Sequence, residues 1–479
     1  MTLHLYDSKA QALREFTPLQ PGVVGIYLCG PTVQSEPHVG HLRSALAYDQ
    51  LRRWLTAKGI QVTLVRNVTD IDDKVLANAV VRNKPWWALA YEMELVFNSA
   101  YRSLGIAAPT YEPRATASIP EMLALIERLV ANGYAYQSTD GSADVYFAAS
   151  KWPQYGELTR QRIEDMADAV DADPRGKLDP RDFALWKAAK ADEPETAAWD
   201  SRFGRGRPGW HIECSAMSTK YLGSAFDIHG GGLDLRFPHH ENELAQSRAA
   251  GDEFANFWLH NGLVNVAGQK MSKSLGNSIY AADLFAAGSP LAVRFWLGSA
   301  NYRSILDYSD ASLTEAQANI DRIAGFLKRA VQTTGIKSNP NLDLAAAYAL
   351  LPQAFVSAMD EDLNIPGALA AVFDAVRAGN SGIDAGDSAA VGQQVQALGA
   401  MLTVLGIHPE ATEWAAANTD SSRENAALDV LIRELIEQRN AARAAKDFAR
   451  ADQIRNQISA AGIVLSDGAD GTHWSISNG

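Results

Sequence analysis

The first clear pattern in the chain is an apolar run that ends abruptly at a turn. Residues 22–29 are apolar and rich in β-branched side chains, and a Gly-Pro pair follows them, which is typical of a buried strand. Apolar side chains then recur every three to five positions from Leu42 to Leu55, and Gly59 follows as a stop signal. This spacing predicts an amphipathic helix.

A second apolar run, residues 60–68, completes a strand, helix, strand unit. Such units build parallel sheets, whose ligands bind at the carboxyl ends of the strands. Cys29 is the last residue of the first predicted strand, and the acidic segment 69–73 comes directly after the second. The sequence therefore predicts an α/β fold with a parallel sheet and puts both features where ligands bind.

The hydrophobic pattern and the composition change in later segments, and these changes predict further subdomains. Residues 121–200 interrupt the pattern with a helix-like stretch and with Pro- and Asp-rich segments, so we expect an inserted subdomain there. A strand-like pattern resumes near residues 226–229, and Ala-rich amphipathic segments after residue 313 predict helices. We therefore expect a catalytic domain in two halves (1–120 and 201–312), the insertion (121–200), a helical bundle (313–420) and a small carboxyl-terminal domain (421–479).

Length and composition fit a folded protein of several domains. The 479 residues correspond to about three domains at roughly 150 residues each. Apolar residues make up 47% and charged residues 21%, which excludes a disordered chain. The amino-terminal residues lack the apolar centre of a signal peptide, and no stretch approaches the roughly 18 consecutive apolar residues of a membrane-spanning helix. We expect a cytoplasmic protein with no membrane partner.

Charge and cysteine content exclude two further classes. A net charge of −13 argues against a protein that coats nucleic acid nonspecifically. The two cysteines, Cys29 and Cys214, are too few for a disulfide scaffold. Buried thiols that act as small apolar residues are the alternative to a chemical role for them.

The segment 37–41 has the character of a phosphate site. It opens the predicted helix, where unpaired backbone N–H groups and the helix dipole favour an anion, and Gly40 lets a ligand approach closely. His38 and His41 share one face of that helix. Taken alone, the segment would favour a capping or packing role for the two histidines.

A basic loop downstream complements this segment. Lys270 and Lys273 are separated by two residues and bracketed by Gly268 and Gly276, which suits a loop that closes. Two ammonium groups on such a loop would neutralise charge as a triphosphate is cleaved. A solvated basic loop is the alternative.

In this order and separation the two motifs resemble the signature pair of class I aminoacyl-tRNA synthetases. The resemblance implies a Rossmann-type catalytic domain that activates an amino acid with ATP, releases pyrophosphate and transfers the acyl group to tRNA. In-line attack on the α-phosphate needs positioning and charge stabilisation above all, so Mg2+ is expected with the ATP. The catalytic residues that the resemblance implies are His38, His41, Lys270 and Lys273, with Gly40 also at the ATP.

A third group of residues indicates which amino acid is activated. The segments 209–217, 226–232 and 237–243 are similar to those of the cysteinyl-tRNA synthetase family. His239 and Glu243 are four apart on a predicted helix, so both side chains can reach one ion. His240 fits equally well by spacing, and only the family pattern selects His239. The resemblance implies one Zn2+ per chain, with Cys29, Cys214, His239 and Glu243 as its ligands.

Zinc explains how cysteine is selected. An ion held by two thiolates, an imidazole and a carboxylate can take the substrate sulfur as a further ligand, whereas the hydroxyl of serine is a much poorer ligand. By resemblance, Cys29, Thr69 and Trp210 line the amino-acid pocket, and Gly231 and Asp234 lie near the adenosine. Packing for Trp210, a strand-end cap for Thr69 and a turn role for Asp234 are the alternatives.

The carboxyl-terminal region indicates tRNA. Between residues 433 and 455 there are six basic and four acidic residues, a balance opposite in sign to that of the whole chain. A helix with a solvated face is the alternative. The segments 438–455, 462–465 and 471–474 are similar to the family's anticodon-recognition region, and 359–364 to its helical bundle. The resemblance implies tRNA(Cys) as a partner beside ATP and L-cysteine, and we expect a monomer.

Two rival functions use the same motifs. The cysteine ligase of mycothiol synthesis shares the ATP and zinc motifs but joins cysteine to an amino sugar, and it lacks the anticodon region. A catalytically silent RNA-binding paralogue is the second rival, and the intact histidine, lysine and metal-ligand candidates count against it. The long carboxyl-terminal portion favours transfer to tRNA.

Overall fold

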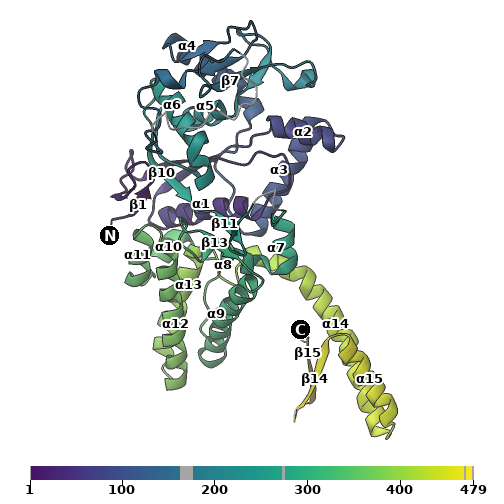
Figure 1. The fold of residues 1–479 in the computed structure, drawn as a ribbon. Helices are drawn as coiled ribbons and strands as arrows, with labels where there is room; N and C mark the ends of the chain where they lie inside the picture. Colours follow the sequence, from purple (N-terminus) through teal and green to yellow (C-terminus); the bar gives the residue numbers. More distant parts are fainter. Residues whose placement is uncertain (1, 162–175, 272–275, 469–470, 477–479) are drawn as a thin grey trace. The chain divides into compact units, whose positions relative to one another are not determined.

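The computed structural model describes residues 2–161, 176–271, 276–468 and 471–476 (Figure 1). They form two compact units, Met1–Ala411 and Thr412–Gly479. The five predicted segments stay predictions, and the boundary between the units lies within the fourth of them.

A four-stranded parallel sheet organises the first unit. Its order is β10 (Phe254–Asn261), β9 (Ala225–Gly232), β3 (Val23–Leu28), β4 (Gln61–Arg66). Helix α1 (Val39–Ala57) connects β3 to β4, so the strand, helix, strand unit predicted from the apolar pattern is confirmed. The predicted α/β fold with a parallel sheet is confirmed with it.

Helices cover both faces of this sheet (Figure 1). Helix α1 packs on one face so closely that a Cβ on Gly230 would lie 2.2 Å from the ring of Tyr48. Helices α5 (Trp210–Leu222) and α6 (Glu241–Ala249) cover the other face, where Leu222 approaches Gly25. Glycine at position 230 is therefore required for α1 to reach the sheet.

The remaining chain of the catalytic region forms smaller sheets and helices. Helices α2 (Asp73–Val81) and α3 (Trp86–Ser103) follow β4. The inserted region has α4 (Ile119–Ala131) and an antiparallel sheet of β5 (Ala135–Gln137), β6 (Val145–Phe147), β7 (Phe183–Ala188) and β8 (Gly206–Pro208). Two further groups are the hairpin β1 (His4–Asp7) and β2 (Ala12–Glu15), and the three-stranded sheet β12 (Gln269–Lys270), β11 (Val264–Val266), β13 (Leu306–Tyr308).

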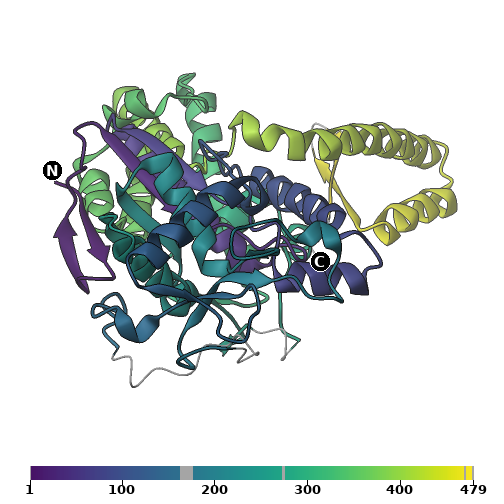
Figure 2. The ribbon, with the colours of Figure 1, turned by 90° about the horizontal axis from the view of Figure 1, so that it is seen from above.

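A helical bundle completes the first unit. It packs against α1 and against α8 (Pro290–Gly298), which follows α7 (Ala281–Ala287), and it is green in Figures 1 and 2. Its members are α9 (Ser312–Thr334), α10 (Leu344–Tyr348), α11 (Gln353–Asp360), α12 (Ile365–Ala385) and α13 (Ser388–Leu405).

The second unit has a small core of its own. It consists of α14 (Thr412–Ala444), α15 (Phe448–Ala460) and the hairpin of β14 (Ile463–Gly468) and β15 (Gly471–Ile476). Isoleucines at a spacing of four on both helices meet in this core, with one more from the hairpin, as the buried residues Ile432, Ile436, Ile454, Ile458 and Ile463. Within the described part of the chain, no helix combines the length and the hydropathy needed to cross a membrane.

A buried arginine links α1, α8 and the bundle. Arg294 of α8 contacts Asp49 of α1 at 2.7 Å, and each side chain is 1% exposed. The same guanidinium donates to two carbonyl oxygens. One belongs to Leu104, directly after α3, and the other to Leu405, the last residue of α13. Burial tends to raise the pKa of Asp49, but Arg294 and Arg53 outweigh it and lower that pKa.

Replacing Arg294 by Ala should therefore lower the free energy of unfolding by about 3 kcal/mol, because the buried Asp49 would lose its closest cation and keep only Arg53, at 3.4 Å. Urea denaturation of the full chain measures this. The matched control is Arg377→Ala, which removes an ion pair to Asp374 whose side chains are 60% and 66% exposed, and which should cost no more than about 1 kcal/mol. Equal losses in the two variants would contradict the account.

Candidate active site

A candidate metal group lies at the carboxyl edge of the parallel sheet. Cys29 directly follows β3, Cys214 lies in α5, and His239 and Glu243 lie on either side of the start of α6. The potential ligand atoms of these four residues all lie within 4.8 Å of one another. The structure thus brings together the four residues that the sequence resemblance selected, although they span 214 positions of the chain.

The contacts inside the group are short. The two sulfur atoms are 3.6 Å apart, and Sγ of Cys29 is 3.3 Å from Oε1 of Glu243. Nε2 of His239 is 3.0 Å from the same carboxylate oxygen. Cys214, His239 and Glu243 are buried, whereas Cys29 is partly exposed and lines a cavity. Cys29 therefore connects the buried group to that cavity.

Two further histidines orient this group. His229 contacts the second carboxylate oxygen of Glu243 at 2.8 Å, and Nδ1 of His211 lies 2.9 Å from Nδ1 of His239. The ring of Trp210 stacks on His239, with centroids 4.1 Å apart. Sequence reasoning gave His229 and His211 no role, although both lie in the segments that carried the family resemblance. The available signal was their position, His229 within β9 and His211 in the first turn of α5.

His240, which the spacing could not distinguish from His239, belongs to a second group. Cys29, His229, His240 and Glu243 also bring their ligand atoms within 4.8 Å of one another. This group contains one thiol rather than two, and Nδ1 of His240 lies 2.8 Å from Nε2 of His260. Because the two groups share Cys29 and Glu243, a single ion would use one of them.

The electrostatics of the first group favour a cation. Burial alone would raise the pKa of Cys214, but a hydrogen bond from the Cys29 thiol and the neighbouring His239 lower it to about 6. Burial would likewise raise the pKa of Glu243, yet His229 and His239 hold it well below its usual value. Burial opposes the charged form of His239, but Glu243 and Cys214 raise its pKa to about 10. The group thus keeps anionic sulfur and oxygen together away from water.

A cavity of about 390 Å³ joins the metal group to the phosphate motif. Met271, just after β12, lies on its wall as well. Single cavities of a few hundred Å³ with converging polar groups are typical of small-ligand sites. The predicted site residues on its wall are Cys29, His38, Gly40, His41, Trp210 and Asp234.

His38 and His41 also cap helix α1. Nδ1 of His38 accepts from the amide of Gly40 at 3.2 Å, and Nδ1 of His41 accepts from the amide of His38 at 3.1 Å. The two rings stack with centroids 3.6 Å apart. The capping role is therefore present, and it is compatible with a ligand role because both residues line the cavity.

The other predicted residues lie elsewhere. Thr69 is buried and donates to Glu213 at 2.8 Å, and the amide of Gly231 donates to the hydroxyl of Tyr48 at 2.7 Å. Neither is among the residues that line the cavity. Lys270 ends β12; its side chain, and Lys273 as a whole, lie outside the described residues.

Three family models together match most of the chain. The model of the class I (C) tRNA synthetase catalytic domain matches residues 15–318, the DALR domain residues 354–408, and the cysteinyl-tRNA ligase anticodon binding domain residues 426–474. A cysteine–tRNA ligase of Clavibacter sepedonicus is 60% identical over an alignment of 484 residues, gaps included. The alignment covers 99% of this chain and 99% of the relative. The chain belongs to the cysteinyl-tRNA synthetase family. A second relative with the same description, from Leifsonia xyli subsp. xyli, is 58% identical over 482 residues, which are 99% of this chain and 100% of the relative.

Solved structures of other class I synthetases share the fold of this cysteinyl-tRNA synthetase family member. Methionyl-tRNA synthetase of Mycobacterium tuberculosis, in complex with methionyl-adenylate, is 18% identical, with a TM-score of 0.56 over 81% of this chain and 90% of the other. A leucyl-tRNA synthetase of Agrobacterium radiobacter K84, bound to tRNA, is 12% identical, with a TM-score of 0.57 over 82% of this chain and 84% of the other. The predicted Rossmann-type catalytic domain followed by helical domains is confirmed.

The 3.6 Å separation of the two sulfur atoms in this synthetase predicts a specific cross-link. After chelation of bound metal, mild oxidation with diamide should join Cys29 to Cys214, because diamide takes up the two thiol hydrogens as the S–S bond forms. Intact mass and loss of alkylation by iodoacetamide measure the reaction. The Cys214→Ser variant should give no intramolecular product. Two thiols that remain alkylatable in the oxidised parent would contradict their placement.

Proposed function

We propose that this cysteine–tRNA ligase holds one zinc ion between Cys29, Cys214, His239 and Glu243 and uses it to select the substrate thiol. The observation that carries the proposal is the convergence of two sulfurs, one imidazole and one carboxylate beside a cavity. Zinc accepts each of these donors, and thiolates favour it over magnesium or calcium. The low pKa of Cys214, about 6, supports a thiolate at neutral pH.

The histidines around the group support the same assignment. Ligand carboxylates and imidazoles in zinc sites are commonly oriented by hydrogen bonds from neighbouring groups. His229 contacts Glu243, and His211 contacts His239, in this way. We assign His229 and His211 to positioning these two ligands.

Selection of cysteine over serine follows from the chemistry of the metal. When bound, zinc supplies a soft Lewis-acid position for the sulfur of the substrate on the cavity side. Shape alone distinguishes near-isosteric substrates by only about 1–3 kcal/mol. A direct interaction with sulfur adds a preference that the hydroxyl of serine cannot match. Trp210, which lines the cavity, and Thr69 are assigned to the amino-acid pocket with Cys29.

The opposite part of the cavity suits ATP. His38 and His41 lie there at the amino terminus of a 19-residue helix, where the dipole and backbone amides favour phosphate. We assign the phosphate roles to these histidines, to Gly40 and to Lys270 and Lys273, with Mg2+ arriving on the nucleotide. Asp234 and Gly231 are assigned to the adenosine side.

These assignments give a two-step reaction. A carboxylate oxygen of L-cysteine attacks the α-phosphorus of ATP in line, and pyrophosphate leaves with cysteinyl-adenylate remaining. A hydroxyl of the 3′-terminal ribose of tRNA(Cys) then attacks the acyl carbon, and AMP leaves. Both steps depend on positioning of substrates and on stabilisation of phosphate charge.

The carboxyl-terminal unit supports tRNA rather than an amino sugar as acceptor. The anticodon-binding family model matches residues 426–474, in the part of the chain that the mycothiol-pathway ligase lacks. Basic side chains are exposed along both of its helices and in the turn between them, among them Arg443, Lys446, Arg450 and Arg455. Local positive charge of this kind attracts a polyanion even in an acidic protein.

The proposal predicts that Cys214→Ser lowers bound zinc below one per chain and raises the KM for cysteine in ATP–pyrophosphate exchange by about 100-fold or more. Metal analysis and the exchange assay measure the two effects. The matched control is Ser218→Ala, one turn further along α5, where the hydroxyl donates to the carbonyl of Ser215. It should leave both values unchanged.

Charging assays complete this test. The parent enzyme should charge tRNA(Cys) with cysteine and reject serine, and should not transfer cysteine to the amino-sugar acceptor. A Cys214→Ser variant that keeps full zinc content and its preference for cysteine would refute the zinc assignment. Transfer only to the amino sugar would refute the acceptor.

A further inference from the structure

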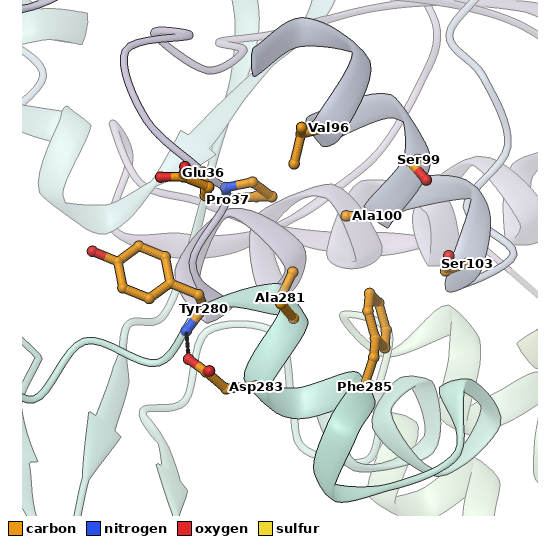
Figure 3. A pocket seen from close by; sticks show the side chains of 11 residues that line it. Glu36, Pro37, Val96, Ser99, Ala100, Ser103, Tyr280, Ala281, Asp283 and Phe285 are labelled. Carbon is orange, nitrogen blue, oxygen red and sulfur yellow. Dashed lines mark hydrogen bonds between the residues drawn. The ribbon is translucent and has the colours of Figure 1, made fainter. Parts of the chain in front are cut away.

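A second cavity, of about 490 Å³, lies between helices α3 and α7 (Figure 3). We call it the groove. Val96 and Ala100 of α3 face Ala281 and Phe285 of α7 across it, and Pro37 lines it beside Glu36. Its size is that of a small-molecule site, and its lining is mostly apolar. No role in the reaction proposed above falls to it.

The charged groups of this groove lie at one end, whereas the hydroxyls of Ser99 and Ser103 lie at the other. Tyr280, Glu36 and Asp283 lie at the left in Figure 3, whereas Phe285 and Ala100 lie towards the right. Among the described residues that line the groove, the charged ones are Glu36 and Asp283, both acidic. The groove therefore has its charged side chains at one end and uncharged, mostly apolar side chains at the other.

This charge pattern selects the occupant. Arg82 already forms a two-pronged contact with Glu36, at 3.0 and 2.9 Å, and Oδ2 of Asp283 accepts from the Tyr280 amide at 3.0 Å. The other carboxylate oxygen of Asp283 and the ring of Tyr280 are the contacts left for an ammonium group. Aromatic rings attract cations at their faces, and carboxylates pair with them. A polyanion such as RNA would be repelled at the same place.

The groove also shares its wall with the candidate active site. Pro37 lines the groove and His38 the active-site cavity; Ala100 lines the groove and Tyr101 the cavity. Between them, Phe97 of α3 packs edge-on against the ring of His41, with centroids 5.0 Å apart. An occupant of the groove therefore lies one layer of side chains from the phosphate motif.

The main chain strengthens this link. The amide of Val39 donates to the carbonyl of Ile279 at 2.9 Å, and the amide of Ala281 donates to the carbonyl of Pro37 at 2.9 Å. These two bonds join the start of α1 to the start of α7, which follows the lysine loop. A ligand that contacts Pro37 and Ala281 contacts both sides of this joint.

We propose that this groove is a second ligand site, for organic ammonium ions with an apolar body, and that its occupancy is coupled to ATP binding. The ammonium group lies at Asp283 and Tyr280, and the apolar body between Val96, Ala100 and Phe285. Coupling of this kind is reciprocal, so a ligand that alters ATP affinity is itself bound with an affinity that ATP alters by the same factor. The binding part is independent of zinc and cysteine; only the coupling part rests on the proposed ATP site.

Three matched probes test the binding part: phenylbutylamine, the neutral phenylbutanol and the anionic phenylbutanoate. Titration of the full-length protein, followed by NMR, should give saturable binding in the order amine, alcohol, acid. Asp283→Asn, which keeps an acceptor for the Tyr280 amide, should weaken the amine about two- to fivefold and leave the alcohol unchanged. Failure of the amine to bind, or equal binding of the three probes, would overturn the proposal.

A blocking variant tests the location and the coupling. Ser99 lines the groove from an exposed position on α3, so Ser99→Trp should abolish amine binding without disturbing the core; Leu95→Trp, one turn earlier and 49% exposed, is the control. Saturating amine should change the dissociation constant for ATP at least about twofold in the parent and in Leu95→Trp, and not in Ser99→Trp. Amine binding that survives in Ser99→Trp, or an ATP affinity that amine leaves unchanged, would overturn the proposal. Absence of ATP binding altogether would instead refute the proposed function.

Discussion

The rest of the structure depends on the burial of two sulfurs and a carboxylate within contact distance of one another. Burial and the neighbouring Cys214 raise the pKa of Cys29. Anionic forms of Cys214 and Glu243 persist this close together only where cations or hydrogen bonds compensate them. His239 and His229 supply part of the compensation at Glu243. A zinc ion would supply the remainder, and the same ion would distinguish a thiol from a hydroxyl. The same group of residues would therefore serve both the stability of the fold and the recognition of the substrate thiol.

The parallel sheet makes this convergence possible. Cys29 directly follows the inner strand β3, and α5 and α6 place Cys214 and Glu243 on the face opposite to α1. Helix α1 begins beside the same sheet edge and brings its histidines to the same cavity. Two kinds of chemistry, soft coordination of sulfur and neutralisation of phosphate, are therefore placed at the two parts of one site. The bridge from Pro37 to Ala281 extends this arrangement to the segment that follows the lysine loop.

The apolar pattern was sufficient to predict the β3, α1, β4 part of the central sheet, but it did not single out β10. It predicted the strand before Cys29, the helix after it and the following strand, because buried strands and amphipathic helices have distinct periods. It could not find the contacts of His229 with Glu243 or of His211 with His239, which join residues 14 and 28 positions apart through the packing of separate elements. Spacing also could not separate His239 from His240, since adjacent residues at a helix start both approach Glu243; the structure assigns them to different groups.

X-ray absorption at the zinc edge tests the central claim most directly. We expect two sulfur neighbours around zinc in the protein alone, three after addition of L-cysteine, and two after addition of L-serine. A sulfur count that stays the same when cysteine is added would contradict the account, because the ion would then have no part in recognising the substrate thiol.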